Sequence, residues 1–401
     1  MTTVSILIAA ILAVPLVLLV AECCAAMLPV RASPTTEGGR RPRVDVLIPA
    51  HNEAETLAHT LPPFLGQLEG DDRVWVVADH CDDRTAEVAG ALGARVLPRQ
   101  EEGQRGKGFA LAFGVAAMAE EPPEVVIVID ADCTPQGGAI DRLARAVAHH
   151  AAPVQGRDQI LAPAAASPGD RISHAATVLK NHIRPLGLSR LGLPCLLAGT
   201  GMGFPWDILR DARLATGHIT EDMLLAVECV IAGKAPRYCP GAVFVSSLPA
   251  DPHAVRTQRT RWEHGHLQVL FTQVPRVVFA ALRNGRPSLL VTACDLAIPP
   301  LSLLAIASSA AMAAAVAMGL LGAGWGPATI LASAGTLAST AVVAALFRHL
   351  PEMSWKWLLA IPRYVIGKLP IYVAFLFRRQ RAWVRTARES NRPATTLGTG
   401  T

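Results

Sequence analysis

The residues of this chain best suited to chemistry are aspartates that follow runs of apolar residues. Asp79 ends the run VVAD, and the pair Asp130 and Asp132 follows the run VVIVI. Alternate residues of an extended chain point the same way, so the pair brings two carboxylates together. Hard divalent cations prefer carboxylate oxygens. The pattern predicts a Mg²⁺ or Mn²⁺ site with Asp132 as ligand and Asp130 as a second ligand, direct or through water. A solvated turn is the alternative.

Two further polar groups lie downstream. Glu221 and Asp222 follow Thr220, and the run QRTRW spans residues 258–262. An acid such as Asp222 suits a general base that takes a proton from an attacking hydroxyl. The same residues suit a helix start, where Thr caps the helix and acids in the first turn oppose its dipole.

The run 258–262 combines an amide, a cation and an indole. Arg261 suits the neutralisation of a leaving diphosphate. The flat face of Trp262 suits stacking on a sugar, and Gln258 suits a hydrogen bond to a hydroxyl or to the diphosphate. A basic amphipathic helix near a membrane is the alternative for this run.

Hydrophobic patterning predicts the elements that position these residues. Apolar strands are predicted over 44–49, 74–78, 94–97 and 125–129. Helices are predicted between them over 53–64, 84–92 and 107–118. This alternation indicates an α/β fold with a mostly parallel sheet covered by helices on both faces.

Sheets of this kind bind ligands at the carboxyl ends of their strands. His51, Asp79 and Asp130 all lie at predicted strand ends, so we expect them to converge on one cleft. Residues 151–194 are less regular, 212–230 reads as a helical region with the acidic pair at its start, and 255–283 reads as an amphipathic helix.

The apolar residues are concentrated in segments long enough for a membrane. Of 401 residues, 51% are hydrophobic and 17% are charged, less charge than in a typical soluble protein. Apolar runs cover 4–20, 289–321 and 327–347, with Asp295 the one acid in the second run. We expect these runs to form membrane-spanning helices. For the first run a cleaved signal peptide is the alternative, which the lack of Lys or Arg in residues 1–5 disfavours.

Basic residues set the expected topology. Arg31, Arg40, Arg41 and Arg43 follow the first apolar run, which predicts a cytoplasmic position for the domain after it. Arg348 and the basic tail, with Arg378, Arg379, Arg381, Arg385 and Arg388, predict a return to the cytoplasm. The segment 355–377 is apolar but holds charges and prolines, which favours an interfacial helix over a span.

Charge indicates which binding partners the chain favours, and the cysteine spacing indicates the state of its thiols. The net charge of +5 is modest, and its basic residues near the apolar runs favour anionic headgroups over nucleic acid. The eight cysteines show no C-x-x-C spacing. They are therefore expected to be reduced thiols rather than disulfides or zinc ligands.

The chain is expected to divide into six regions. They are an N-terminal transmembrane anchor (1–28), a linker (29–43), a cytoplasmic catalytic domain (44–254), an amphipathic interfacial segment (255–288), a transmembrane hairpin (289–348), and an interfacial helix with a basic cytoplasmic tail (349–401).

In this order the motifs resemble the membrane-bound branch of the family 2 glycosyltransferases, which includes cellulose, chitin and hyaluronan synthases. That branch shows an Asp, an Asp-x-Asp, a Thr-Glu-Asp and a Gln-x-x-Arg-Trp. The resemblance covers roughly residues 43–270. It implies a GT-A fold and inverting transfer of a hexose from a nucleotide sugar, with uridine as the base and Asp222 as general base. Glu221 would orient the loop or bind a neighbouring hydroxyl.

The resemblance also implies nucleotide-binding roles for residues of the predicted sheet edge, namely Ala50, Glu53, Asp79, Lys107 and Asp130. Asp79 would accept a hydrogen bond from the uracil imide, and Asp130 would contact the ribose. Lys107, in a Gly-Lys-Gly at a helix start, would support the phosphates or ribose. Helix capping is the alternative for Glu53, and a plain turn for the Gly-Lys-Gly.

Departures from the branch favour a single transfer. The segment LLAGTGMGFPWDIL lacks the aromatic pair of processive synthases, and no Phe-x-Val-Thr-x-Lys follows Trp262. About three spans are too few for a polysaccharide channel. We therefore expect a multi-pass enzyme of the cell inner or plasma membrane that acts on a lipid-linked or glycan acceptor.

Three alternatives stay open. One is a processive synthase that works with partner subunits for glycan export. Another is a metal-dependent nucleotidyltransferase, which needs neither Asp222 nor the Trp motif. The last is an inactive scaffold, which the intact acidic positions disfavour.

Overall fold

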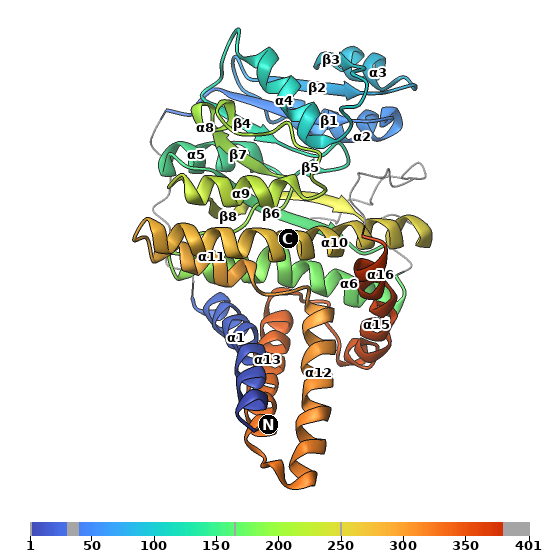
Figure 1. Ribbon diagram of the computed structural model, residues 1–401. Helices are drawn as coiled ribbons and strands as arrows, with labels where there is room; N and C mark the ends of the chain where they lie inside the picture. Colours follow the sequence, from blue (N-terminus) through green and yellow to red (C-terminus); the bar gives the residue numbers. More distant parts are fainter. Residues whose placement is uncertain (1, 30–39, 164–165, 249–250, 380–401) are drawn as a thin grey trace.

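A single eight-stranded sheet forms the centre of the molecule (Figure 1). The computed structural model describes residues 2–29, 40–163, 166–248 and 251–379. The strand order is β3-β2-β1-β4-β7-β6-β8-β5. The strands are β1 (Val44–Ala50), β2 (Arg73–Asp79), β3 (Arg95–Arg99), β4 (Val125–Val128), β5 (Thr134–Pro135), β6 (Val154–Leu161), β7 (Met202–Pro205) and β8 (Arg237–Ser247).

The first half of this sheet is parallel and the second half is mixed. Strands β3, β2, β1 and β4 run parallel to one another. Strand β7 runs antiparallel to both β4 and β6, β8 is parallel to β6, and β5 is antiparallel to β8. The predicted α/β class is confirmed, and its parallel part is the part that the apolar strand pattern predicted.

Helices cover both faces of the sheet because strand residues alternate between two cores. In β1, Val46 and Ile48 pack with Phe64 on one face, and Leu47 packs on the other. Gly114 lets a helix approach this strand, since an added Cβ there would lie 2.4 Å from Leu47 Cδ1. The helices of the catalytic part are α2 (Ala54–Leu65), α3 (Thr85–Ala91), α4 (Lys107–Met118), α5 (Ala139–His150), α6 (Pro168–Val178), the π-helical turn η1 (Leu179–Ile183), α7 (Arg184–Arg190), α8 (Trp206–Arg210) and α9 (Glu221–Ile231).

Two predictions for the middle of the chain need correction. Much of the described part of 151–194 is regular, because β6 is followed by the helical run α6–η1–α7. Strand β6 lacks a clear apolar pattern because it buries polar residues such as Gln155. The hydrogen bonds of Gln155 are made by the distant residues Ala198 and Thr200. The helix predicted from 212 begins only at Glu221. The loop before it packs on α4, where a Cβ at Gly108 would lie 2.4 Å from the Leu214 carbonyl oxygen.

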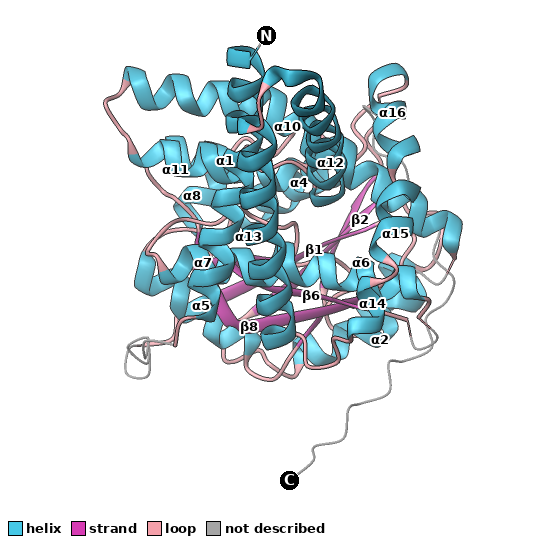
Figure 2. Cartoon of the chain, turned by 90° about the horizontal axis from the view of Figure 1, so that it is seen from below, coloured by secondary structure: helices cyan, strands magenta, loops and turns pink. Residues whose placement is uncertain are grey.

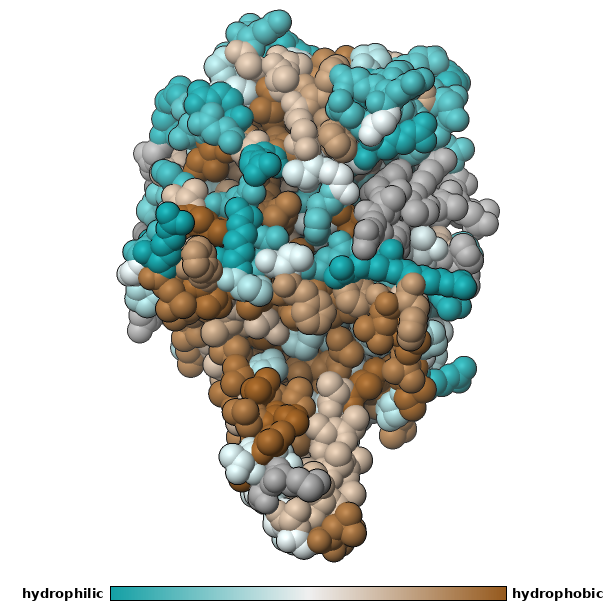
Figure 3. Space-filling model, viewed as in Figure 1, coloured by the Kyte–Doolittle hydropathy of each residue, from teal (hydrophilic) through white to brown (hydrophobic). Residues whose placement is uncertain are grey.

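Apolar helices project from one side of the catalytic part. Helices α1 (Thr2–Met27), α12 (Leu301–Met318) and α13 (Gly326–His349) lie together below the sheet (Figures 1 and 2). Figure 3 shows that this lower part is mainly hydrophobic and the upper part mainly hydrophilic. In the described residues, four helical segments are long and apolar enough to cross a membrane: Thr3–Met27, Leu301–Ala323, Gly326–His349 and Trp355–Phe377.

The apolar stretch 289–321 is not one continuous helix. It consists of α11 (Ser288–Leu296) and α12, with Pro299 and Pro300 between them. Helix α11 packs with α10 (Pro252–Arg283) against α9 in one apolar cluster. The apolar run therefore includes a helix of the catalytic part as well as a candidate span, because buried packing and lipid both select apolar residues. Residues Gly319–Ala323 form a π-helical segment, η2.

The segment 355–377 consists of three short helices that return to the catalytic part. They are α14 (Trp355–Leu358), α15 (Ile361–Gly367) and α16 (Leu369–Phe377). Glu263 of α10 is ion-paired with Lys368 and accepts a hydrogen bond from Tyr372 of α16 at 3.0 Å. The predicted linker residues 30–39 with Arg31, and the tail 380–401 with Arg381, Arg385 and Arg388, lie outside the described residues.

A buried ion cluster joins the N-terminal helix to the catalytic part. Arg184 of α7 donates to Glu22 of α1 at 2.6 Å and to Asp295 of α11 at 2.5 Å. All three side chains are buried. Helices α7 and α1 are in close contact, because a Cβ at Gly187 would lie 2.0 Å from the Glu22 carbonyl oxygen. The cluster therefore fixes a candidate membrane span against the part of the protein that contains the sheet.

We predict that Arg184→Met destabilises the folded protein by about 3–5 kcal/mol, because it leaves two buried carboxylates without their cation. Thermal unfolding of the full chain in detergent measures this. Arg210→Met is the control, since Arg210 and its partner Asp211 are exposed and such pairs contribute at most about 1 kcal/mol. Equal melting temperatures for the two variants would show that the cluster does not stabilise the fold.

Candidate active site

The structure brings every site residue predicted from the sequence to one cavity of about 290 Å³. The cavity lies at the carboxyl ends of β1, β2 and β4 and extends to α9 and α10. The predicted residues that line it are Ala50, Glu53, Asp79, Lys107, Asp130, Asp132, Glu221, Asp222, Gln258, Arg261 and Trp262.

The loop after β1 forms one wall of the cavity. His51 bonds through Nδ1 to the carbonyl oxygen of Asp79 at 2.7 Å, which ties this loop to the end of β2. Glu53 stands at the N-cap of α2, but its side chain makes no capping hydrogen bond. Asp83 instead accepts from the backbone N–H groups of Ala54 at 3.2 Å and Thr85 at 2.9 Å. Capping therefore belongs to Asp83, and the Glu53 side chain is a cavity group.

Lys107 is the cation at the centre of the cavity. Its Nζ donates to the Asp130 carboxylate and to the Gly199 carbonyl oxygen, each at 2.5 Å. Burial acts to lower the pKa of Lys107, but the negative charges of Asp130, Glu221 and Asp222 outweigh it and raise the pKa. The ammonium therefore stays charged and holds three elements of the site together.

A glycine loop between α7 and β7 brings backbone groups to Lys107. Gly199 and Gly201 have φ of +91° and +63°, values that favour glycine. The Thr200 hydroxyl accepts from the backbone N–H of Asp130 at 3.1 Å. Buried Gln155 holds the loop from below, donating to the Thr200 carbonyl and accepting from the N–H of Ala198, both at 2.8 Å. The loop is thus fixed on both sides.

The acidic pair opens helix α9, as the helix-start interpretation predicted. Thr220 is the N-cap, but its side chain makes no capping hydrogen bond and contacts His218 Nδ1 at 3.1 Å instead. Burial raises the pKa values of both Glu221 and Asp222, against the lowering effect of Lys107. Carboxylates with raised pKa values in a cavity are suited to proton transfer.

Helix α10 supplies the third wall. Gln258, Arg261 and Trp262 share one helix face because they are three and four residues apart, and all three line the cavity. The buried Oε1 of Gln258 has no hydrogen-bond partner among the described residues. Arg259, between them in sequence, faces elsewhere, 3.7 Å from the Asp170 carboxylate and over the Tyr364 ring.

Several cavity residues carried no sequence signal. Asp158 of β6 is buried, and its pKa is raised to about 7 by burial and then by the charges of Asp130 and Asp132. Asn181 of η1 donates to it at 2.8 Å. Lys180, also on η1, lines the cavity beside them. A π-helical turn often occurs at functional sites, but no sequence pattern announces one.

The carboxylates at the end of β4 fit a cation that shares its ligands with a substrate. Within the residues that the structure describes, no cluster of three or more His, Cys, Asp or Glu side chains forms a complete metal site. Magnesium and manganese sites in phosphate-handling enzymes commonly use one or two carboxylates and complete the shell with water and substrate phosphates. Asp130 and Asp132 meet that requirement.

The sheet, its acidic edge and its paired carboxylates suit both a sugar transferase and a nucleotidyltransferase, so the geometry alone leaves both classes open. A model of the family described as "Glycosyltransferase like family 2" matches residues 42–265, more than half of the chain. The protein belongs to this family. Family membership favours sugar transfer over nucleotidyl transfer.

Two known proteins illustrate the relationship. A probable glycosyltransferase of Bacillus subtilis is 27% identical over 245 residues, which are 57% of this chain and 56% of that protein. The match thus spans about half of that relative's length. The solved mannosyltransferase of Pyrobaculum calidifontis, in complex with GDP-Man and Mn²⁺, superposes with a TM-score of 0.57 at 20% identity. The superposition covers 94% of this chain and 100% of that one, and it shows a shared fold.

We predict that Glu221→Gln raises the melting temperature at pH 8 in the presence of a chelator. Because burial raises the folded-state pKa of Glu221 above its ordinary 4.5, ionisation of this group weakens the fold as the pH rises above that value. The amide removes this cost. Near pH 4 the two proteins should melt together, since the carboxyl is then protonated in both states.

Glu120→Gln, at an exposed position, is the matched control and should change the melting temperature little at either pH. A Glu221→Gln variant that is less stable than the parent at pH 8 would contradict the predicted charge strain.

Proposed function

We propose that this protein is a membrane-bound inverting glycosyltransferase that moves a hexose from a nucleoside-diphosphate sugar to a lipid-linked or glycan acceptor. One observation carries the proposal: the carboxylates at the end of β4, the acid pair of α9 and the Arg-Trp face of α10 line the same cavity. The candidate membrane helices lie on the side of α10 away from β1 and β2 (Figure 1).

The nucleotide lies along the carboxyl ends of the parallel strands, as ligands of such sheets do. Ala50 and Glu53 contact the base or ribose from the β1–α2 loop. Asp79, at the end of β2, accepts a hydrogen bond from the base. Asp130 contacts the ribose or reaches the cation through water, and Lys107 supports the phosphates.

Asp132, with support from Asp130, would hold a divalent cation, Mg²⁺ or Mn²⁺. Such a cation would supply positive charge for the departing diphosphate. Arg261 of α10 supplies further positive charge for the same leaving group. The residues of the chain thus surround the diphosphate from the sheet and from the helix.

Asp222 is the general base. Its carboxylate takes the proton from the acceptor hydroxyl while that oxygen attacks the anomeric carbon from the face opposite the leaving group, which inverts the configuration. Burial raises the pKa of Asp222, and the charge of Lys107 acts to lower it. Glu221 orients the loop or bonds a neighbouring hydroxyl. Trp262 stacks on a sugar ring, and the unpaired Gln258 amide oxygen accepts from a sugar hydroxyl.

The acceptor approaches from the membrane. Helix α10 carries exposed Phe271, Phe279 and Leu282, side chains suited to the headgroup region. The positive-inside pattern of the sequence supports a multi-pass arrangement with the catalytic part on the cytoplasmic face of the inner or plasma membrane. A lipid-linked acceptor would meet the cavity there without leaving the bilayer.

We predict that Asp132→Ala abolishes metal-dependent release of nucleoside diphosphate, with a fall of about a hundredfold or more, because the cation loses its main protein ligand. Asp207→Ala, at an exposed position on α8, should leave turnover unchanged. The assay compares release with and without Mn²⁺ across a panel of nucleotide sugars. Full Mn²⁺-stimulated turnover by Asp132→Ala would remove this residue as ligand.

We also predict that Asp222→Asn still binds the donor but loses transfer by about 10²–10⁴-fold, the usual contribution of a general base. Calorimetric donor binding and transfer to extracted membrane lipid are measured on the same preparation. Glu228→Gln on the same helix serves as control. Near-normal transfer by Asp222→Asn would mean that another group accepts the proton.

A further inference from the structure

The cavity has a second side, away from the strands that would bind the nucleotide. Strand β6 lies beyond β4 and β7 in the sheet, on the side opposite β1 and β2. Because β7 is antiparallel to both β4 and β6, the carboxyl end of β6 points to the same edge as that of β4. Asp158 of β6, with Lys180 and Asn181 of η1, lines the cavity. These three residues, the β6–η1 group, border the space that the proposed donor leaves for an acceptor.

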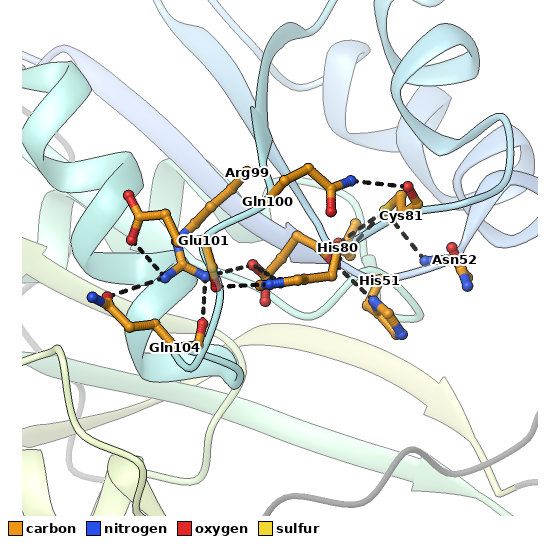
Figure 4. Close-up of polar contacts among 10 residues, drawn as sticks. His51, Asn52, His80, Cys81, Arg99, Gln100, Glu101 and Gln104 are labelled. Atoms are coloured by element: carbon orange, nitrogen blue, oxygen red, sulfur yellow. Dashed lines mark hydrogen bonds and ion pairs between the residues drawn. The ribbon is translucent and has the colours of Figure 1, made fainter.

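The polar groups on the nucleotide side are held by contacts within the protein. Asp79 accepts from Arg99 Nη1 at 2.6 Å. Arg99 also donates to the Gln104 carbonyl oxygen at 2.7 Å, and His80 Nε2 lies 2.9 Å from the Glu101 carbonyl oxygen. Figure 4 shows Arg99 and His80 pointing to the loop that carries Glu101 and Gln104. This side of the cavity is therefore fixed by its own hydrogen bonds.

On the β6 side, buried oxygens are left without donors. Asp158 is 8% exposed, and Asn181 donates to its Oδ2 at 2.8 Å. The Oδ1 of Asp158 is buried and has no hydrogen-bond partner in the described part of the chain. The same holds for Oε1 of Gln258, which reaches the cavity from α10. A buried acceptor without a donor is destabilising, so both oxygens are suited to hydroxyl groups of a ligand.

Lys180 adds a cation to this side. Its side chain is exposed and lines the cavity. Among the described residues, no carboxylate forms an ion pair with its ammonium. Its charge acts to lower the pKa values of Asp158 and Asp222, so it lies near the acid of β6 and near the proposed base. An unpaired ammonium in a cavity is suited to a phosphate group of a ligand.

The turn η1 connects this cation to the apolar helices. Leu179 and Ile183, at the two ends of η1, pack in one cluster with Leu19 of α1 and Ala345 of α13. Lys180 follows Leu179 directly but lines the cavity. The turn thus has candidate membrane spans on one side and the cavity on the other. A group bound at Lys180 is therefore close to the part of the protein that would meet the membrane.

We propose that the β6–η1 group is an acceptor subsite for a hydroxyl-rich headgroup that is joined to its lipid through phosphate. Hydroxyls of the headgroup donate to Asp158 Oδ1 and Gln258 Oε1, and the phosphate binds Lys180. Another hydroxyl gives its proton to Asp222, and its oxygen bonds to the anomeric carbon as the diphosphate leaves. This inference rests on the proposed function and adds the chemical class of the acceptor.

Two simpler acceptors fit the subsite less well. A bare lipid phosphate has no hydroxyl for the two unpaired oxygens and would bring negative charge against Asp158. A neutral glycolipid supplies hydroxyls but leaves Lys180 without a counter-ion. The subsite therefore requires both features in one acceptor.

The first test compares four lipids as acceptors for the full-length protein in detergent, with Mn²⁺ and a nucleotide sugar that it cleaves. Phosphatidylinositol and an isoprenyl-diphosphate-linked sugar carry both features. An isoprenyl monophosphate carries only the phosphate, and a diacylglycerol glucoside carries only the hydroxyls. One of the first two should accelerate release of nucleoside diphosphate at least about tenfold more than either of the last two, and its identity distinguishes the two lipid sources. Acceleration by neither of the first two, or greater acceleration by one of the last two, would overturn the proposal.

The second test removes the cation. Lys180→Gln should raise the KM for the phosphate-bearing acceptor by about tenfold or more, the scale of one charged hydrogen bond, and should leave donor affinity unchanged. Lys180→Arg should restore most of the loss. Lys234→Gln, an exposed lysine after α9, is the matched control. A fall in donor affinity with an unchanged acceptor KM would mean that Lys180 binds the donor and would contradict the subsite.

The third test removes the acid. Asp158→Ala should raise the acceptor KM by about tenfold without changing the Mn²⁺ concentration that half-activates the enzyme, and Asp207→Ala should change neither quantity. A higher Mn²⁺ requirement with an unchanged acceptor KM would make Asp158 part of the cation site and would overturn its role here. If Asp158→Ala does not fold, Lys180→Gln decides alone, because the Lys180 side chain is exposed.

The subsite and the proposed function fail in different ways. Calorimetric binding of glycerophosphoinositol, a soluble headgroup, needs no donor. Binding that depends on Lys180, without cleavage of any sugar donor, would refute the transferase and keep the subsite. Release of nucleoside diphosphate with the same acceptor KM in the parent and in Lys180→Gln would keep the transferase and refute the subsite.

Discussion

The site depends on one buried ammonium group among carboxylates. Lys107 contacts Asp130 and the Gly199 carbonyl, and its charge acts on both Glu221 and Asp222. Burial raises the pKa values of both α9 acids, and the charge of Lys107 acts to lower them. The helix start that supplies Lys107 therefore acts on ionisable groups of another element, α9.

The same constraint explains the glycines around Lys107. Gly108 lets the loop before α9 lie directly on the start of α4, and the left-handed Gly199 turns its carbonyl toward the ammonium. The Gly-Lys-Gly sequence thus allows close packing and places the Lys107 ammonium beside Asp130 in the cavity.

The enzyme core and the apolar helices form a continuous unit. Arg184 joins α1 to α7 and α11, and Glu263 joins α10 to the helices after residue 354. Helix α10 lies between these two junctions and carries the Arg-Trp face of the cavity. Helix α10 therefore links the helices after residue 354 to the cavity wall that carries Gln258, Arg261 and Trp262.

The sequence predicted the half of the fold whose pattern is local. Apolar strands followed by acids, such as β2 with Asp79 and β4 with Asp130, predicted both the parallel sheet and the edge of the sheet where the cavity lies. The second half was not predictable in this way, because β6 carries Gln155 and Asp158 inward and tertiary bonds satisfy them. The contact of Arg99 with Asp79 and the place of Lys180 in the cavity likewise depend on residues that are distant in sequence. The apolar run 289–321 was predicted as one membrane segment but contains two helices, α11 and α12. Burial in the protein and contact with lipid both favour apolar side chains, so the sequence does not separate them.

The central claim is that one cavity holds a nucleotide sugar by its diphosphate and transfers the sugar. The most direct measurement is ³¹P NMR of the phosphorus products that the purified full-length protein forms from nucleotide sugars with Mn²⁺ and membrane lipid. The account predicts an intact nucleoside diphosphate as the phosphorus product. Release of pyrophosphate or of a nucleoside monophosphate would contradict it.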